Sequence, residues 1–156
     1  MSFSQWVTSL PISEKRMLEL FPPFLFMGVK VLGGDMQKHR WIEVRLPLKW
    51  RSKNMHGTMF GGLVCCLSDP LPTLLCERIF EGTLVWTKKQ TVHFRRPART
   101  DLDLKVEISE EAILDIQKQL DEKGSAERAF HFQFKDQKQR VIADVENIIF
   151  LKKVRS

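Results

Sequence analysis

Long apolar segments and paired cysteines are absent from this sequence of 156 residues. No apolar run is long enough to cross a membrane as a helix, and the N-terminus lacks the basic and apolar segments of a secretory signal. The three cysteines, Cys65, Cys66 and Cys76, form no Cys-x-x-Cys pair, and their number is odd. We therefore expect a cytoplasmic protein with reduced, buried cysteines, and a reactive thiol is the alternative.

Internal repeats and low-complexity tracts are also absent. The composition is 43% hydrophobic and 28% charged, which is typical of a folded globular protein. The length fits one domain over residues 1–156, and it allows a sizeable core without disulfides. No metal-ligand or cofactor motif stands out, so we expect neither group to be resident.

Positive charge exceeds negative charge, with 25 Lys and Arg against 19 Asp and Glu. A solvated surface with a sign bias is the default explanation. Attraction to a phosphorylated small ligand is the sharper one, because basic residues gather in one stretch: Lys88, Lys89, Arg95, Arg96 and Arg99. We do not expect nucleic-acid binding, because no such motif is present and the aromatic residues do not interleave with the basic ones.

Patterns of apolar residues, most of them alternating with polar ones, predict strands at 27–32, 42–48, 84–97, 101–108, 130–135 and 141–151. Gly33–Gly34–Asp35 would form a turn after the first strand. Pro47 would mark a strand end or an edge strand. The blurred alternation at Lys88–Gln90 indicates a bulge, in a strand whose Val92 and Phe94 would point inward.

Three segments predict helices. Residues 13–21 would form a short N-terminal helix, capped by Ser13 and stopped by Pro22–Pro23. An extra surface helix near 110–123 would be capped by Ser109 and closed by Gly124. The helix over 58–80 would be apolar almost all round and must therefore be buried on most sides. We expect an α+β fold in which one antiparallel sheet wraps around this long central helix.

The start of the central helix carries Gly61 and Gly62. The first N–H groups of a helix have no partner within it and favour negative charge. Glycine would let a substrate carbonyl approach these groups closely, as in an oxyanion hole. Close packing of the helix on the sheet explains the two glycines equally well.

Asp69 follows Gly62 by about two helical turns and stands at the end of an apolar run. An acid in apolar surroundings needs a reason, because an unpaired buried charge is costly. Pro70 would disfavour helical geometry at Asp69 and kink or break the helix there. The carboxylate could cap the next helical piece, or it could act as a general base in a site of low dielectric.

The pattern of this segment resembles the active-site segment of hotdog-fold acyl-CoA thioesterases of the phenylacetyl-CoA thioesterase type. The pattern is Asn54-x-x-Gly57-Thr58-x-Phe60-Gly61-Gly62, followed by Asp69. The later segment from Thr91 to Ala98 is similar to a strand and Arg-Pro-Ala turn of that family, and the chain looks closest to an uncharacterised branch of it. The resemblance implies a hotdog fold, in which a sheet wraps around one helix.

The resemblance also implies roles for individual residues. Asp69 would activate water or attack the thioester, and the N–H of Gly61 would polarise the thioester carbonyl. Asn54 would position the acid or the substrate. Thr87 would place a hydroxyl beside the acid, although strict alternation along its strand would put it on the face opposite Phe94 unless the bulge shifts it.

The family's histidine is replaced by Phe60, which cannot donate a hydrogen bond. Phe60, Met59 and Trp86 are candidate contacts for the acyl group, and Gly62 would lie beside the substrate. His56 is a further candidate contact, although a histidine in a loop is more often only solvated.

Relatives of this type are dimers or tetramers whose sites are shared between protomers, so Gly61 and Asp69 of one site would come from different chains.

Arg95, Arg96 and Arg99 would suit the phosphates of coenzyme A, and a solvated strand end is the equal alternative for them. The resemblance therefore implies an acyl-CoA thioesterase, with coenzyme A present only as part of the substrate. A non-catalytic protein that binds acyl-CoA or a lipid ligand is the alternative. The acyl group itself is not specified.

Overall fold

The computed structural model describes residues 14–35 and 40–154. Within these ranges six strands form one antiparallel sheet in the order β1-β2-β4-β5-β6-β3. Their bounds are β1 Lys30–Asp35, β2 Trp41–Leu46, β3 Thr83–Phe94, β4 Leu102–Glu107, β5 Ser125–Asp136 and β6 Val141–Lys153. The predicted α+β fold with an antiparallel sheet is confirmed.

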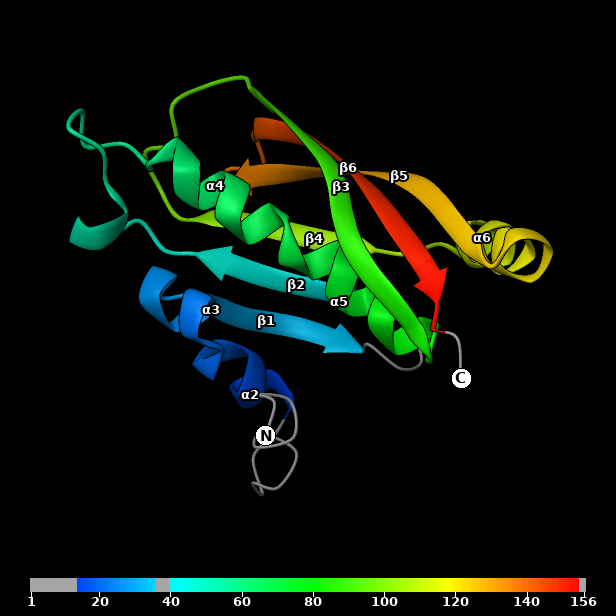
Figure 1. Ribbon diagram of the computed structural model, residues 1–156. Helices are drawn as coiled ribbons and strands as arrows, with labels where there is room; N and C mark the ends of the chain where they lie inside the picture. The colour runs from blue at the N-terminus through cyan, green and yellow to red at the C-terminus, as the bar shows by residue number, and fades with distance from the viewer. Residues whose placement is uncertain (1–13, 36–39, 155–156) are drawn as a thin grey trace.

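The central helix consists of α4 (Gly61–Ser68) and α5 (Pro70–Ile79), which follow one another along one face of the sheet (Figure 1). Leu67, Leu71 and Leu75 of this helix are fully buried. They belong to the same hydrophobic cluster as the inward side chains of the strands, such as Val44 and Ile149. The sheet therefore encloses the helix, as the sequence predicts.

The central helix begins at Gly61 rather than at Thr58. The preceding residues are extended, because Met59 N–H donates to the Ala98 carbonyl (2.9 Å) and Phe60 N–H donates to the Ser52 carbonyl (2.8 Å). The prediction that Pro70 disfavours helical geometry at Asp69 is wrong, since Asp69 has φ −67° and ψ −54°. Pro70 interrupts the helix only by removing a hydrogen-bond donor.

The N-terminal region contains α2 (Glu14–Leu20) and α3 (Pro22–Met27). The helix predicted over 13–21 is α2, and its predicted cap Ser13 lies outside the described residues. Pro22 ends α2 as expected, but it also begins α3, because proline suits the first position of a helix. The turn predicted at Gly33–Gly34–Asp35 is wrong, since these residues belong to β1. Gly33 lies there against Trp41, whose ring carbon Cη2 would lie 3.0 Å from a Cβ at residue 33.

The predicted bulge in β3 is confirmed, because the register with β6 shifts between Thr87 and Lys89. The shift places Thr87 on the same face as Val92 and Phe94. Val92 packs against the core as predicted. Phe94 turns toward α4, but half of its surface remains exposed (50%).

The extra helix is α6 (Glu110–Lys123), as predicted. Ser109 caps it by accepting a hydrogen bond from the N–H of Ala112 (3.2 Å), and Gly124 ends it with φ 70°. Ile116 and Leu120 are buried and face the sheet.

Pro47 marks a strand end as predicted, because β2 ends at Leu46. None of the described helices is both long and apolar enough to cross a membrane.

Candidate functional site

The loop before α4 is organised by Asn54. Its side-chain oxygen accepts hydrogen bonds from the backbone N–H groups of His56 (2.9 Å) and Thr58 (3.2 Å), and its amide nitrogen donates to the Thr58 hydroxyl (2.9 Å). Gly57 has φ 73°, a left-handed conformation that glycine adopts without strain. Asn54 therefore fixes the chain that leads into the helix, and its amide groups are engaged within this loop.

A cavity of about 440 Å³ opens at the beginning of α4. It is lined by Asn54, Thr58, Met59, Gly61, Val64, Phe94, Arg95, Arg96, Pro97, Ala98 and Ile142. Within the described chain, the N–H groups of Gly61 and Gly62 have no hydrogen-bond acceptor. Such free donors at a helix start suit a carbonyl oxygen that gains negative charge.

The two glycines also lie close to aromatic rings. A Cβ at Gly61 would lie 3.1 Å from Cζ of Phe94, and a Cβ at Gly62 would lie 2.5 Å from Cε1 of Phe60. Phe60 and Phe94 thus cover the first turn of α4 on two sides. Both are about half exposed, at 53% and 50%. The packing explanation and the ligand explanation of these glycines are therefore compatible.

Asp69 lies at the junction of α4 and α5, eight residues from Gly61, or about 12 Å along the helix axis. Its side chain is exposed in the single chain, so the expectation of a buried acid is wrong for one protomer. The Thr87 hydroxyl approaches the Asp69 backbone carbonyl (3.5 Å). The β3 bulge therefore brings Thr87 and Asp69 together, while Gly61 and Asp69 of one chain stay apart.

Three buried or half-buried polar residues, Ser68, Gln90 and Asn147, form hydrogen bonds next to Asp69, and the sequence analysis does not identify them. The side-chain amide of Asn147 donates to the Ser68 carbonyl (2.8 Å), and that of Gln90 donates to the Ser68 hydroxyl (3.1 Å) and to the Cys65 carbonyl (3.2 Å). Asn147 interrupts the otherwise apolar inward stripe of β6, between Val145 and Ile149. That interruption is the sequence signal that could have identified it.

The three arginines between β3 and β4 differ in whether they bond a carboxylate. Arg95 donates to Asp144, and this hydrogen bond lowers the pKa of the Asp144 carboxyl, with a further contribution from Gln133. Among the described residues, Arg96 and Arg99 have no carboxylate partner, and Arg96 lines the cavity. The structure therefore leaves Arg96 and Arg99 available for an anionic ligand.

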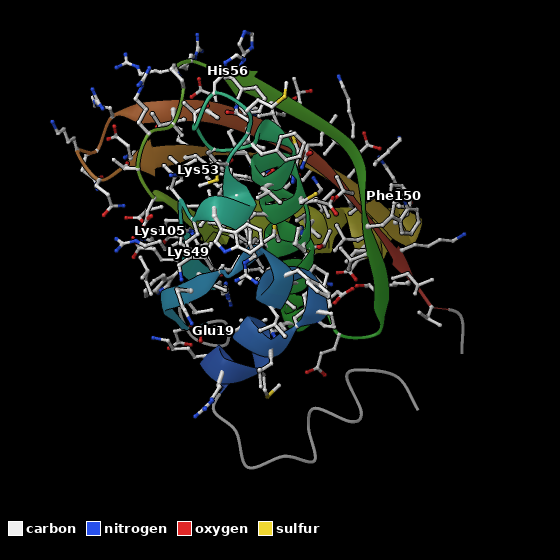
Figure 2. All side chains as sticks on the ribbon, turned by 90° about the vertical axis from the view of Figure 1, so that its left-hand side faces the viewer. Glu19, Lys49, Lys53, His56, Lys105 and Phe150 are labelled. Carbon is white, nitrogen blue, oxygen red and sulfur yellow. The ribbon has the colours of Figure 1, made fainter. Side chains whose placement is uncertain are left out.

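The remaining candidate residues divide by position. Met59 is buried and lines the cavity. His56 is exposed at the outer rim of this end of the molecule (Figure 2). Trp86 lies on the face of the sheet away from the helix, with its ring 4.7 Å from that of Phe150, so the structure does not bring it to Gly61 within one chain.

The cysteines behave as small apolar side chains in two of three cases. Burial raises the pKa of the Cys76 thiol to about 12, and it raises the pKa of Cys65 as well. Cys66 is exposed on α4. In the part of the chain that the structure describes, no group of three or more His, Cys, Asp or Glu side chains could hold a metal ion.

A larger hollow of about 770 Å³ lies on the outer face of the sheet, where β4 and β5 pair at only three positions. Some of its charged side chains neutralise one another, as in the pairs Arg95–Asp144 and Lys105–Glu107. Arg95 is the one candidate residue that lines it, and it also lines the cavity at the start of α4. The hollow and that cavity share no other lining residue.

Comparisons with known proteins agree with the fold. The sequence model of the family described as domain of unknown function (DUF4442) matches residues 13–151. No curated protein matches the chain. A protein of unknown function and probable thioesterase from Pseudomonas aeruginosa has a similar structure, with a TM-score of 0.79 and 21% identity over 93% of this chain and 99% of the other.

Two further solved structures are similar. The thioesterase HI1161 from Haemophilus influenzae has a TM-score of 0.67 and 12% identity, over 89% of this chain and 88% of the other. The PaaI protein of the phenylacetic acid degradation operon of E. coli has a TM-score of 0.65 and 15% identity, over 99% and 98%. These likenesses show that the chain has the hotdog fold.

Proposed function

We propose that this chain, which belongs to the family described as domain of unknown function (DUF4442), is an acyl-CoA thioesterase. Its site would form between two copies. The observation that carries the proposal is that the N–H groups of Gly61 and Gly62 at the start of α4 have no acceptor among the described residues, and that Gly61 lines a cavity. The similar solved structures described as thioesterases support the same reaction class.

In the proposed reaction the thioester carbonyl oxygen accepts hydrogen bonds at the start of α4. These donors stabilise the negative charge that develops when water attacks the carbonyl carbon. The Asp69 carboxylate of a second copy takes a proton from that water as general base. A C–O bond forms, the C–S bond breaks, and the proton passes to the leaving thiolate. The products are a carboxylic acid and free coenzyme A.

A second copy is needed because one chain separates the two groups. Gly61 and Asp69 stand at opposite ends of α4, about 12 Å apart along its axis. Among the described strands β3 pairs only with β6, so its other edge is open along twelve residues. An open edge of this length is a template for pairing with another strand. Antiparallel pairing of β3 with its copy would bring the Gly61 end of one α4 toward the Asp69 end of the other.

Binding of the substrate would divide between apolar and basic groups. Met59, Val64 and Ile142 give the cavity an apolar wall that suits an acyl chain. Arg96 lines the cavity, and neither Arg96 nor Arg99 has a carboxylate partner among the described residues, so both guanidinium groups suit the phosphates of coenzyme A. Coenzyme A would be part of the substrate and no resident cofactor would be needed.

A non-catalytic acyl-CoA or lipid-binding protein is the second candidate. Phe60 is the observation that favours it, because a phenyl ring stands where the similar family pattern has a histidine, and it can neither donate a hydrogen bond nor carry charge. The exposed Asp69 also lacks an ion-pair partner among the described residues. This candidate predicts binding of acyl-CoA without turnover.

The two candidates are separated by hydrolysis of a panel of acyl-CoA thioesters of different chain length and aromatic content. We expect turnover by the wild type and a loss of about 10²-fold or more in Asp69→Asn. Glu81→Gln is the matched control, because Glu81 is an exposed acid at the other end of α5. If the wild type hydrolysed no thioester faster than Asp69→Asn does, the proposed thioesterase activity would be contradicted.

Calorimetry with the same compounds tests binding. Binding without turnover would establish the second candidate, whereas the absence of both would exclude the two candidates together. Arg96→Ala and Arg99→Ala should weaken the affinity for acyl-CoA more than that for the acyl group attached to a short thiol, because only coenzyme A carries the phosphates.

A further inference from the structure

Two prolines remove hydrogen-bond donors from the junction of α4 and α5. In an unbroken helix the N–H of residue 70 would bond the Cys66 carbonyl, and that of residue 72 would bond the Ser68 carbonyl. Pro70 and Pro72 have no N–H. The Ser68 carbonyl therefore needs a donor from outside the helix, because it lies in the protein interior with a residue that is 0% exposed.

Asn147 supplies that donor from the sheet. Its Nδ2 lies 2.8 Å from the Ser68 carbonyl oxygen, and the two residues are 79 positions apart in the sequence. A carbonyl oxygen can only accept, so the amide nitrogen must face it. Asn147 is completely buried, and its own Oδ1 has no partner among the described residues. An unpaired buried acceptor is costly, so the donor is the part of this side chain that the structure uses.

The other end of the same peptide group is also held. The Ser68–Asp69 peptide presents its carbonyl to Asn147 and its N–H to the Cys65 carbonyl (3.3 Å). Gln90, the register partner of Asn147 on β3, donates to that Cys65 carbonyl as well (3.2 Å). Two neighbouring strands thus fix the orientation of the peptide from which the Asp69 side chain projects.

We propose that Asn147 is a positioning residue that replaces the missing N–H of Pro72 and thereby aims the Asp69 carboxylate. The inference rests on the proposed function, because it assigns to Asn147 the placement of the general base. Asn147 does not touch substrate, and it acts through the Ser68–Asp69 peptide. It should therefore govern the rate of the chemical step rather than the binding of acyl-CoA.

The test compares Asn147→Leu with a double variant. Leucine keeps the approximate volume and leaves the Ser68 carbonyl without a donor. We expect kcat for acyl-CoA hydrolysis to fall about tenfold or more, with KM changed less than about twofold. Pro72→Ala restores an N–H at residue 72, so Asn147→Leu/Pro72→Ala should recover most of the lost kcat. Pro72→Ala alone provides the reference for that recovery.

Val145→Ala is the matched control, because Val145 is buried on the same face of β6, two residues away. It should destabilise the fold with kcat unchanged. An equal loss of kcat in Val145→Ala and Asn147→Leu, or no rescue by Pro72→Ala, would overturn the positioning role.

Hydrogen exchange separates this inference from the proposed function. If the wild type hydrolyses no acyl-CoA, the proposed function fails, but the hold of Asn147 on the junction is still measured by exchange of the Asp69 amide. We expect that exchange to be about tenfold faster in Asn147→Leu, with the amides of β5 little changed. Unaltered exchange at Asp69 would overturn the inference whatever the activity.

Discussion

Gly61 combines an N–H that has no acceptor among the described residues with a tight contact. It lines the cavity, and the Phe94 ring lies where a side chain at residue 61 would extend. Because Phe94 is half exposed, its ring can move aside at little cost. Substitution at residue 61 should therefore affect catalysis much more than folding.

For Gly61→Ala we expect a folded protein whose kcat/KM for acyl-CoA falls about 10²-fold, the effect of losing one oxyanion donor. The added methyl group would keep the substrate carbonyl away from the N–H. Steady-state kinetics and thermal unfolding measure the two effects. Gly61→Ala/Phe94→Ala removes the contact with the ring and is the control. If this double variant regained activity, packing rather than carbonyl access would explain the glycine.

At the level of elements, the turn between β5 and β6 depends on one carboxylate. Asp136 is 2% exposed and accepts hydrogen bonds from the N–H groups of Lys138 and Arg140 (both 2.9 Å) and from the Arg140 guanidinium (2.7 Å). Burial acts to raise the pKa of Asp136, but the Arg140 side chain and the two backbone donors outweigh it, and the pKa is lowered.

A carboxyl group whose pKa is lower in the folded state stabilises the fold above its unfolded pKa of about 3.9. This contribution is lost as the pH falls through the lower folded value. We expect Asp136→Asn to be less stable than the wild type at pH 7, and the difference to shrink below about pH 4. Urea unfolding between pH 7 and pH 3 measures it. A difference that stays constant over this range would contradict the assignment.

Local signals account for the elements that the sequence predicts. Ser109 and Gly124 define α6 because a cap depends on residues a few positions away. The bulge in β3 disturbs the alternation around Lys88, and this disturbance predicts it. The turn predicted at Gly33–Gly34–Asp35 fails because these glycines make room for Trp41 across the sheet, and such a neighbour is not visible in the local sequence.

The candidate site could be predicted only in part, because contacts between residues distant in the sequence leave no local signal. Gly61 and Asn54 belong to one continuous segment and share the cavity. Asn147 reaches Ser68 from β6, 79 positions away in the sequence, and Gln90 faces the same way only because the bulge shifts the β3 register by one residue. The exposed position of Asp69 could not be predicted from its apolar neighbours, because they face the core while Asp69 faces outward.

For the whole molecule, the open edge of β3 is the feature with the widest consequence. It is twelve residues long, and Phe94 at its end is half exposed. We expect light scattering at micromolar concentration to give a mass of at least two chains. A monomer at all concentrations would contradict a site shared between copies.

The central claim is that Gly61 of one copy and Asp69 of another form one site, and complementation between inactive variants tests it most directly. Gly61→Ala and Asp69→Asn are expressed separately and then refolded together in equal amounts. Half of the dimers should be mixed, and each mixed dimer regains one intact site, so the account predicts about a quarter of the wild-type activity. Activity no greater than the sum of the two separate variants, from a mixture shown to contain mixed dimers, would contradict it.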